Sequence, residues 1–171
     1  SFSPGPGVGG HCIPIDPVFI NWVAKKNSLK TTFISSARAM NLKVTKWVID
    51  EILNKAPKIK NKKLNMKILI VGLAYKADVN DTRESPSLKI FGALSKYNNS
   101  IDFHDNKINK IKLLGKIHYS KPLKTCSTYD YVIICTNHSY LNKNLLLKKS
   151  KIVFDTRNLF ENLKSKKIIR L

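Results

Sequence analysis

The feature that most constrains the fold is a change in hydrophobic pattern after residue 66. From there, short apolar runs alternate with helical or polar stretches at the intervals of βαβ units. The expected strands are 67–72, 101–105, 116–119, 130–135, 151–156 and 167–170. Ser85 and Pro86 predict the start of a helix over 85–97, because serine caps helices and proline is favoured in their first turn. The pattern predicts an α/β fold, a doubly wound parallel sheet of five or six strands over 66–171.

The residues before this pattern are organised differently. Residues 1–16 are rich in Gly and Pro, and a short helix is expected over 17–27 with Asp16 as its N-cap. A longer helix is expected over 31–55, and Pro57 ends it. Apolar side chains recur along it at helical spacing: Phe33, Ala37, Met40, Val44, Trp47 and Val48. This stripe is typical of a core or a dimer seam.

Composition and charge limit the kinds of partner that this protein is expected to bind. The 171 residues hold 31 Lys+Arg against 11 Asp+Glu, a formal charge of +20, which leaves a nucleic-acid-binding domain as one hypothesis. Few of these cations are Arg, the residue that grips phosphate bidentately, and the Lys-rich segment 55–67 is interpreted as a solvated linker. We therefore expect no nucleic acid as partner. We also expect no membrane as partner, because no apolar run approaches the ~20 residues of a spanning helix.

The first candidate motif is the glycine-rich segment 5–10. It formally matches G-x-G-x-x-G, but no strand precedes it, and Pro14 and Pro17 prevent the helix that a dinucleotide site needs after it. Its glycines predict instead that the backbone approaches a neighbour or a ligand closely.

Cys12 follows this turn almost directly. A thiol there can be held against a substrate, with backbone N–H groups nearby to stabilise an oxyanion, whereas the alternative is a buried structural cysteine. His11 need not be its base, because neighbouring side chains of an extended segment point apart. Asp16 is either a helix cap only or a carboxylate that faces the same site.

The second candidate is the loop 73–86, at the carboxyl end of the first expected strand. Open α/β sheets bind ligands at this edge, and the loop exceeds an ordinary connection. Lys76 and Arg83 suit phosphate groups, whereas a plain solvated loop is the alternative. Arg157, after the strand 151–156, is expected to face the same crevice. Because only Gly72 remains of a dinucleotide fingerprint, a mononucleotide diphosphate fits better, although Asp105 lies where a ribose-binding acid often does.

The remaining cysteines and histidines receive no functional role. Cys126 and Cys135 are expected in the core, and with Cys12 they are too scattered for a disulfide framework, which predicts a reducing cytoplasm. Three of the histidines have no metal-ligand spacing, so no metal is expected: His104, His118 and His138.

Three segments, in this order, resemble the UDP-glucose/GDP-mannose dehydrogenase family. GPGVGGHCIPIDP is similar to its active-site cysteine motif, GLAYKADVNDTRESP to the start of its nucleotide-sugar-binding domain, and FDTRN to its late arginine motif. The sequence of the cysteine motif most resembles the branch that acts on UDP-N-acetylhexosamines (mannosamine, glucosamine or galactosamine forms). In this motif, His11 and Ile15 replace residues usual in the UDP-glucose branch. The resemblance implies an active-site loop and short helix (1–30), a central dimerisation helix and linker (31–65), and a Rossmann-like UDP-sugar-binding domain (66–171).

The resemblance also implies a mechanism. Such enzymes oxidise the sugar C6 alcohol to a carboxylate in two hydride transfers to NAD+. Cys12 would carry the thiohemiacetal and thioester, and Asp16 would orient water or a catalytic amine. Lys76 and Arg157 would bind the UDP-sugar, and Arg83 would reach the NAD side. The sugar pocket would be lined by the backbone of Gly7, Gly9 and Gly10.

One large departure accompanies the resemblance. The family's N-terminal, NAD-binding half has no counterpart in these 171 residues. We therefore expect a C-terminal portion that is inactive alone and that pairs with such an N-terminal half, as a homodimer through the helix 31–55. A non-catalytic nucleotide-sugar-binding module is the alternative.

Overall fold

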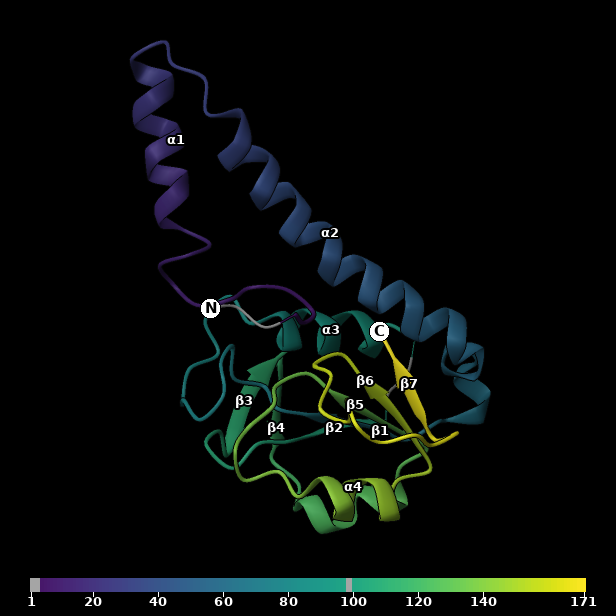
Figure 1. The fold of residues 1–171 in the computed structure, drawn as a ribbon. Coiled ribbons are helices and arrows are strands. Elements are labelled where there is room, and N and C mark those ends of the chain that lie inside the picture. Colours follow the sequence, from purple (N-terminus) through teal and green to yellow (C-terminus); the bar gives the residue numbers. More distant parts are fainter. Residues whose placement is uncertain (1–3, 98–99) are drawn as a thin grey trace.

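The computed structural model describes residues 4–97 and 100–171, so the first three residues of the predicted active-site loop lie outside the described residues. Across the described residues, five parallel strands form one sheet in the order β2-β1-β5-β6-β7 (Figure 1). They are β1 (Ile68–Val71), β2 (Ile101–His104), β5 (Tyr131–Ile134), β6 (Ile152–Asp155) and β7 (Ile168–Arg170). The predicted α/β fold with a parallel sheet is confirmed.

The strand order creates a switch point beside the first strand. β1 pairs with β2 on one side and with β5 on the other, with Ile68 opposite both Ile101 and Tyr131. The connections that leave β1 and β5 therefore run in opposite directions, which opens a crevice at the carboxyl ends of these strands. The loop 73–85 and the loop 135–142 both lie at this edge.

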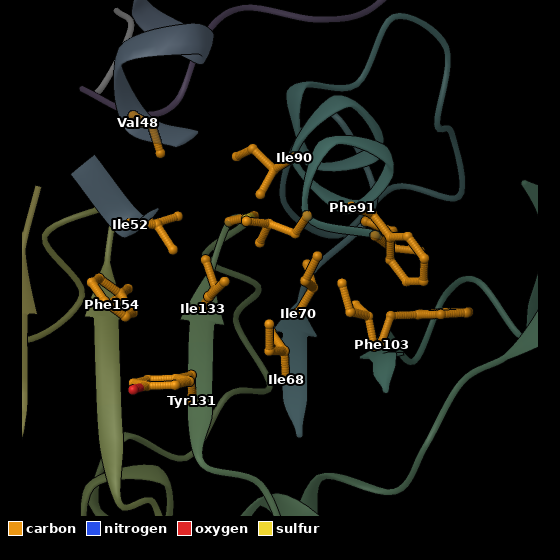
Figure 2. Close-up of a cluster of buried hydrophobic side chains, with 14 of the residues drawn as sticks. Val48, Ile52, Ile68, Ile70, Ile90, Phe91, Phe103, Tyr131, Ile133 and Phe154 are labelled. Carbon is orange, nitrogen blue, oxygen red and sulfur yellow. The ribbon is translucent and has the colours of Figure 1, made fainter. Parts of the chain in front are cut away.

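Helices cover both faces of the sheet. The long helix α2 (Thr32–Lys55) and α3 (Pro86–Ser95) pack on one face, and α4 (Lys143–Lys149) with the 3-10 turn η3 (Leu123–Thr128) packs on the other (Figure 1). Alternate strand residues therefore enter two different cores, which explains why the strands read as continuous apolar runs. Figure 2 shows the first core, which includes Val48, Ile52, Ile70, Ile90, Ile133 and Phe154.

One predicted strand of the sheet is wrong. The segment 116–119 forms β4 (Lys116–Tyr119), which pairs antiparallel with β3 (Lys110–Leu113) in a separate hairpin. Leu114 and Gly115 connect the two strands, both with positive φ, the conformation of a tight hairpin turn. Because β4 is mostly exposed, its side chains could not fill a place in a sheet that is buried on both faces.

Two boundaries in the N-terminal part also differ from expectation. Helix α1 (Asp16–Lys26) has Ile15 at the N-cap, and over the described residues no side chain caps it, so the predicted N-cap role of Asp16 is wrong. The segment 55–67 contains the 3-10 turns η1 (Pro57–Lys60) and η2 (Lys62–Leu64). Its lysines are exposed, but Ile59 is completely buried, so this part of the expected solvated linker belongs to the core.

Candidate functional site

The glycine-rich loop is attached to helix α2 by two polar side chains. Asn41 accepts a hydrogen bond from the Val8 amide (2.8 Å) and donates one to the Val8 carbonyl (3.1 Å). One helical turn later, the Thr45 hydroxyl donates to the Pro6 carbonyl (2.7 Å). The sequence analysis missed both residues, which are four residues apart and therefore lie on one face of the helix.

The other side of this loop lies directly against the sheet domain. A Cβ atom on Gly9 would come within 2.8 Å of both the Glu84 carbonyl oxygen and Tyr75 Cβ. A Cβ on Gly5 would collide with the Arg157 guanidinium. The predicted close approach of these glycines is thus an approach to the loop 73–86 and to Arg157. All three motifs, although far apart in the sequence, thus meet here at the carboxyl edge of the sheet.

Cys12 lies exposed in the turn that leads into α1. Its carbonyl accepts hydrogen bonds from the amides of Ile15 (3.1 Å) and Asp16 (2.7 Å), which shape this turn. The Gly10 amide donates to the Arg83 carbonyl (2.9 Å), and the Cys12 thiol lies near enough to the Arg83 side chain to contribute to its electrostatics. The alternative of a buried structural Cys12 is wrong, and Asp16 is exposed close by in the chain.

Arg83 itself pairs with a carboxylate of its own loop. Its Nε lies 3.1 and 3.0 Å from the two oxygens of Asp81, and its Nη2 lies 2.6 Å from Oδ2. These side-chain hydrogen bonds, with one from the Arg83 amide, lower the pKa of Asp81 to about 2. The Arg83 side chain remains 61% exposed, so it is accessible to a ligand.

Arg157 is held more firmly than Arg83. Its Nε donates to the Cys135 carbonyl (2.7 Å), and its amide donates to the Asp155 carboxylate (3.1 Å). Burial lowers the pKa of Arg157, but an arginine stays charged at neutral pH. A fixed cation therefore lies between the end of β6 and the glycine-rich loop.

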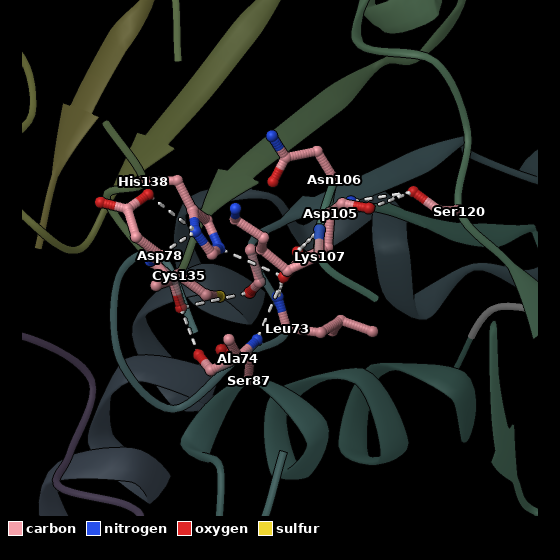
Figure 3. Close-up of polar contacts among 12 residues, drawn as sticks. Leu73, Ala74, Asp78, Ser87, Asp105, Asn106, Lys107, Ser120, Cys135 and His138 are labelled. Carbon is pink, nitrogen blue, oxygen red and sulfur yellow. Dashed lines mark hydrogen bonds and ion pairs between the residues drawn. The ribbon is translucent and has the colours of Figure 1, made fainter. Parts of the chain in front are cut away.

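Asp105 connects three loops at the same edge (Figure 3). Its buried carboxylate accepts hydrogen bonds from the amides of Leu73 (2.8 Å), Ala74 (3.2 Å) and Lys107 (2.9 Å), and it also lies 3.1 Å from His138 Nε2. Asp105 follows β2 directly, the place expected of a ribose-binding acid, but its side chain is completely buried and is used for these contacts between loops.

Lys76 lies exposed in the middle of the loop 73–85. Among the residues that the structure describes, its ammonium group makes no hydrogen bond or ion pair. Lys107, which was not singled out from the sequence, follows β2 and acts electrostatically on Asp78 of the same loop. Lys76, Lys107, Arg83 and Arg157 therefore all lie on loops at the carboxyl edge of the sheet.

The remaining candidates are part of the core or of loop contacts. Cys126 and Cys135 are buried as predicted, and burial raises the pKa of Cys135 to about 12. The His118 ring contacts Phe91 edge-on, with ring centroids 4.9 Å apart. Over residues 4–97 and 100–171, no three His, Cys, Asp or Glu residues are grouped as a metal site. In the same ranges, no helix has the length and apolarity to cross a membrane.

Comparisons with known proteins show to which family this chain is related. The UDP binding domain of the UDP-glucose/GDP-mannose dehydrogenase family matches residues 69–162, and the central domain of that family matches residues 1–43. UDP-N-acetyl-D-mannosamine dehydrogenase of Methanococcus vannielii is 35% identical over 171 residues, which cover 94% of this chain and 37% of the relative. The enzyme of that name from Escherichia coli K12 is 30% identical, over 80% of this chain and 33% of its own length.

Solved structures agree with the sequence relatives. The UDP-D-ManNAc dehydrogenase of Pyrococcus horikoshii superposes with a TM-score of 0.76 at 27% identity, over 99% of this chain and 39% of that one. A UDP-N-acetyl-mannosamine dehydrogenase of Staphylococcus aureus gives a TM-score of 0.66 at 29% identity, over 98% of this chain and 38% of that one. This chain thus spans 33% to 39% of the length of these relatives, and it belongs to the UDP-glucose/GDP-mannose dehydrogenase family.

Proposed function

We propose that this chain provides the catalytic cysteine and the nucleotide-sugar site of an NAD-dependent UDP-sugar 6-dehydrogenase, with a UDP-N-acetylhexosamine as substrate. The observation that carries the proposal is the contact between the glycine-rich loop and the carboxyl edge of the sheet. Through it, the exposed Cys12 thiol lies beside the loop that bears Lys76 and Arg83, and Gly5 lies against Arg157. A nucleophile and several cations suited to a diphosphate thereby share one edge.

Cys12 would act on the sugar C6 aldehyde. Its thiolate forms a C–S bond to the carbonyl carbon, and the oxyanion takes a proton to give a thiohemiacetal. Loss of a hydride from this carbon and of the hydroxyl proton leaves a thioester, which water cleaves to the carboxylate while the thiol is released. NAD+ would accept the hydride in each of the two oxidations. Arg83, near Cys12, would stabilise negative charge at the adduct and reach toward the cofactor, and Asp16 would orient the water.

The nucleotide end of the substrate would bind at the sheet. Lys76 and Arg157 would hold the diphosphate, and the backbone of Gly7, Gly9 and Gly10 would line the sugar pocket. Residue ranges 1–30, 31–65 and 66–171 would then correspond to the cysteine loop with its short helix, the central helix and linker, and the UDP-sugar domain.

The helical arm, which consists of α1 and the first half of α2, indicates which partners to propose. A groove of about 530 Å³ lies between α1, α2 and the loop before α1, and apolar side chains such as Ile13, Val18 and Phe33 line it. These surfaces would be covered by an NAD-binding half like that of the longer relatives and by a second copy of the chain along α2. Three free cysteines suit a reducing cytoplasm.

Calorimetric titration of the chain with UDP and with UDP-N-acetylmannosamine tests the binding step. We expect binding of both ligands, and a loss of about tenfold or more in Lys76→Ala, the range of a charge-assisted hydrogen bond. Absence of heat with both ligands would contradict the proposed site.

Catalysis is tested by adding the N-terminal half of the Methanococcus vannielii relative in trans and following NADH absorbance. We expect turnover that Cys12→Ser abolishes and that heat-denatured N-terminal half does not support. Turnover that persists in Cys12→Ser would rule out the thiol mechanism. UDP binding without any turnover would favour a non-catalytic module.

A further inference from the structure

His138, to which the sequence analysis gave no role, is completely buried beside the switch point between β1 and β5 (Figure 3). Its Nδ1 accepts a hydrogen bond from the Asp78 backbone amide (3.0 Å). A backbone amide can only donate, so Nδ1 carries the lone pair and Nε2 carries the proton. Nε2 donates this proton to the Asp105 carboxylate, with 3.1 Å between Nε2 and Oδ2. The neutral ring thus connects the loop after β1 to the end of β2.

Asp78 is in a backbone conformation that needs such support. Its φ is 62°, in the left-handed region that few non-glycine residues adopt and that Asp tolerates better than most. Its side chain accepts hydrogen bonds from the Ser139 amide (3.0 Å) and hydroxyl (3.1 Å). His138 and Ser139 are adjacent, so two consecutive residues after β5 hold one residue of the loop after β1.

The first residues of the loop after β1 are also bound by the Asp105 carboxylate. Asp105 accepts the amides of Leu73 and Ala74 directly, and it reaches Asp78 through His138. Lys76 lies between these two attachment points, with only its immediate neighbours between them. The Lys76 backbone is therefore fixed on both sides, although its own ammonium has no partner among the described residues.

We propose that His138 is a positioning residue that fixes the loop 75–78 so that Lys76 is presented to the diphosphate of the nucleotide sugar. This inference rests on the proposed diphosphate-binding role of Lys76. A histidine suits the position because its two ring nitrogens can accept from a backbone amide and donate to a carboxylate at once. A loop arranged before binding loses less conformational entropy when the ligand arrives.

The test is a UDP titration of the full 171-residue chain and its variants. We expect His138→Leu to weaken UDP binding about tenfold, because the acceptor for the Asp78 amide is lost and the loop is no longer ordered in advance. His138→Asn, which places an oxygen near the position of Nδ1, should restore a large part of the affinity. Val153→Ala, which cuts into the buried core of β6, should lower the melting temperature and leave UDP affinity unchanged.

Hydrogen exchange of the Asp78 amide gives a readout that does not depend on UDP. We expect faster exchange in His138→Leu, with unchanged exchange in the strand β1. Unchanged exchange of the Asp78 amide would overturn the positioning role. So would an affinity loss in Val153→Ala as large as that in His138→Leu, or an affinity in His138→Leu within twofold of wild type. Failure of the wild-type chain to bind UDP would instead overturn the proposed function, whatever the exchange result.

A measurement on the wild-type chain covers the case in which His138→Leu does not fold. Nitrogen-15 NMR of the His138 ring should show a non-protonated Nδ1, with a scalar coupling across the hydrogen bond to the Asp78 amide. A protonated Nδ1 would overturn the proposal without any variant.

Discussion

Helix α2 passes through two regions of the molecule that differ in the burial of their apolar side chains. In its second half, Val48 and Ile52 are buried against the sheet, at 2% and 0% exposure. In its first half, Phe33 and Met40 are 85% and 59% exposed. Helix α1 packs beside this first half, and among the described residues none of its side chains is buried (Figure 1).

The second half of α2 belongs to a closed core, whereas its first half belongs to an exposed apolar surface. The strands β1 and β5 are buried along their whole length, because helices cover both faces of the sheet. The arm, which consists of α1 and the first half of α2, exposes large apolar side chains that no other part of the described residues covers. Contiguous exposed apolar surface of this kind is typical of an interaction site. The proposed NAD-binding half and the proposed second copy of the chain would cover the arm.

The largest expected difference between the two regions is thiol reactivity. Cys12 is exposed in the turn before the arm, whereas Cys126 and Cys135 are buried in the sheet domain. We expect one equivalent of thiol to react rapidly with a disulfide reagent at pH 8. The other two should react on the order of a thousandfold more slowly, because the core must open first. Cys12→Ser should remove the fast equivalent, and two fast equivalents would show that the sheet domain is not closed.

Truncation at two positions of α2 compares the regions within one helix. Ile52→Ala should lower the free energy of unfolding by about 2–5 kcal/mol, because it opens a cavity in the core. At low protein concentration, where the chain is a monomer, Met40→Ala should change it by less than about 0.5 kcal/mol, because the side chain is mostly exposed. Urea unfolding at several protein concentrations measures both. A concentration-dependent loss in Met40→Ala would mean that copies of the chain cover the arm.

A smaller effect is expected where the glycine-rich loop joins α2. Thr45→Val removes the hydroxyl that donates to the Pro6 carbonyl and should cost about 1 kcal/mol of unfolding free energy. Thr45→Ser keeps the hydroxyl and serves as the control. Hydrogen exchange at Val8 should accelerate in Thr45→Val. Unchanged exchange there would show that Asn41 alone holds the loop.

The smallest effect concerns the exposed pair of Asp81 and Arg83. Because Arg83 lowers the pKa of Asp81 to about 2, the pair stabilises the folded chain above the ordinary Asp range, near pH 4. This contribution disappears as the pH falls through about 2, and solvent screening keeps it small. Carbon-13 NMR of the Asp81 carboxyl should show a midpoint near 2. Arg83→Leu should move the midpoint toward 4, and an unshifted midpoint would contradict the pairing.

The sequence predicted the parts of the fold that depend on local pattern. Continuous apolar runs predicted the five strands of the sheet, and Ser85 with Pro86 predicted α3, whose N-cap is indeed Ser85. The KIHY run was misassigned to the sheet because a short apolar pattern does not reveal its pairing partner. Ile59 was missed for a similar reason, since its burial depends on η1 packing beneath α2 and not on its lysine-rich neighbours.

The sequence by itself determined the alternation of strands and helices and the motifs that carry Cys12, Lys76 and Arg157, because these are properties of adjacent residues. Only the tertiary structure revealed the junctions between motifs. Asn41 meets Val8, and Asp105 meets His138, in each case across 33 residues of chain. Such contacts are decided by strand order and by the competition for buried hydrogen-bond partners, which no local spacing encodes.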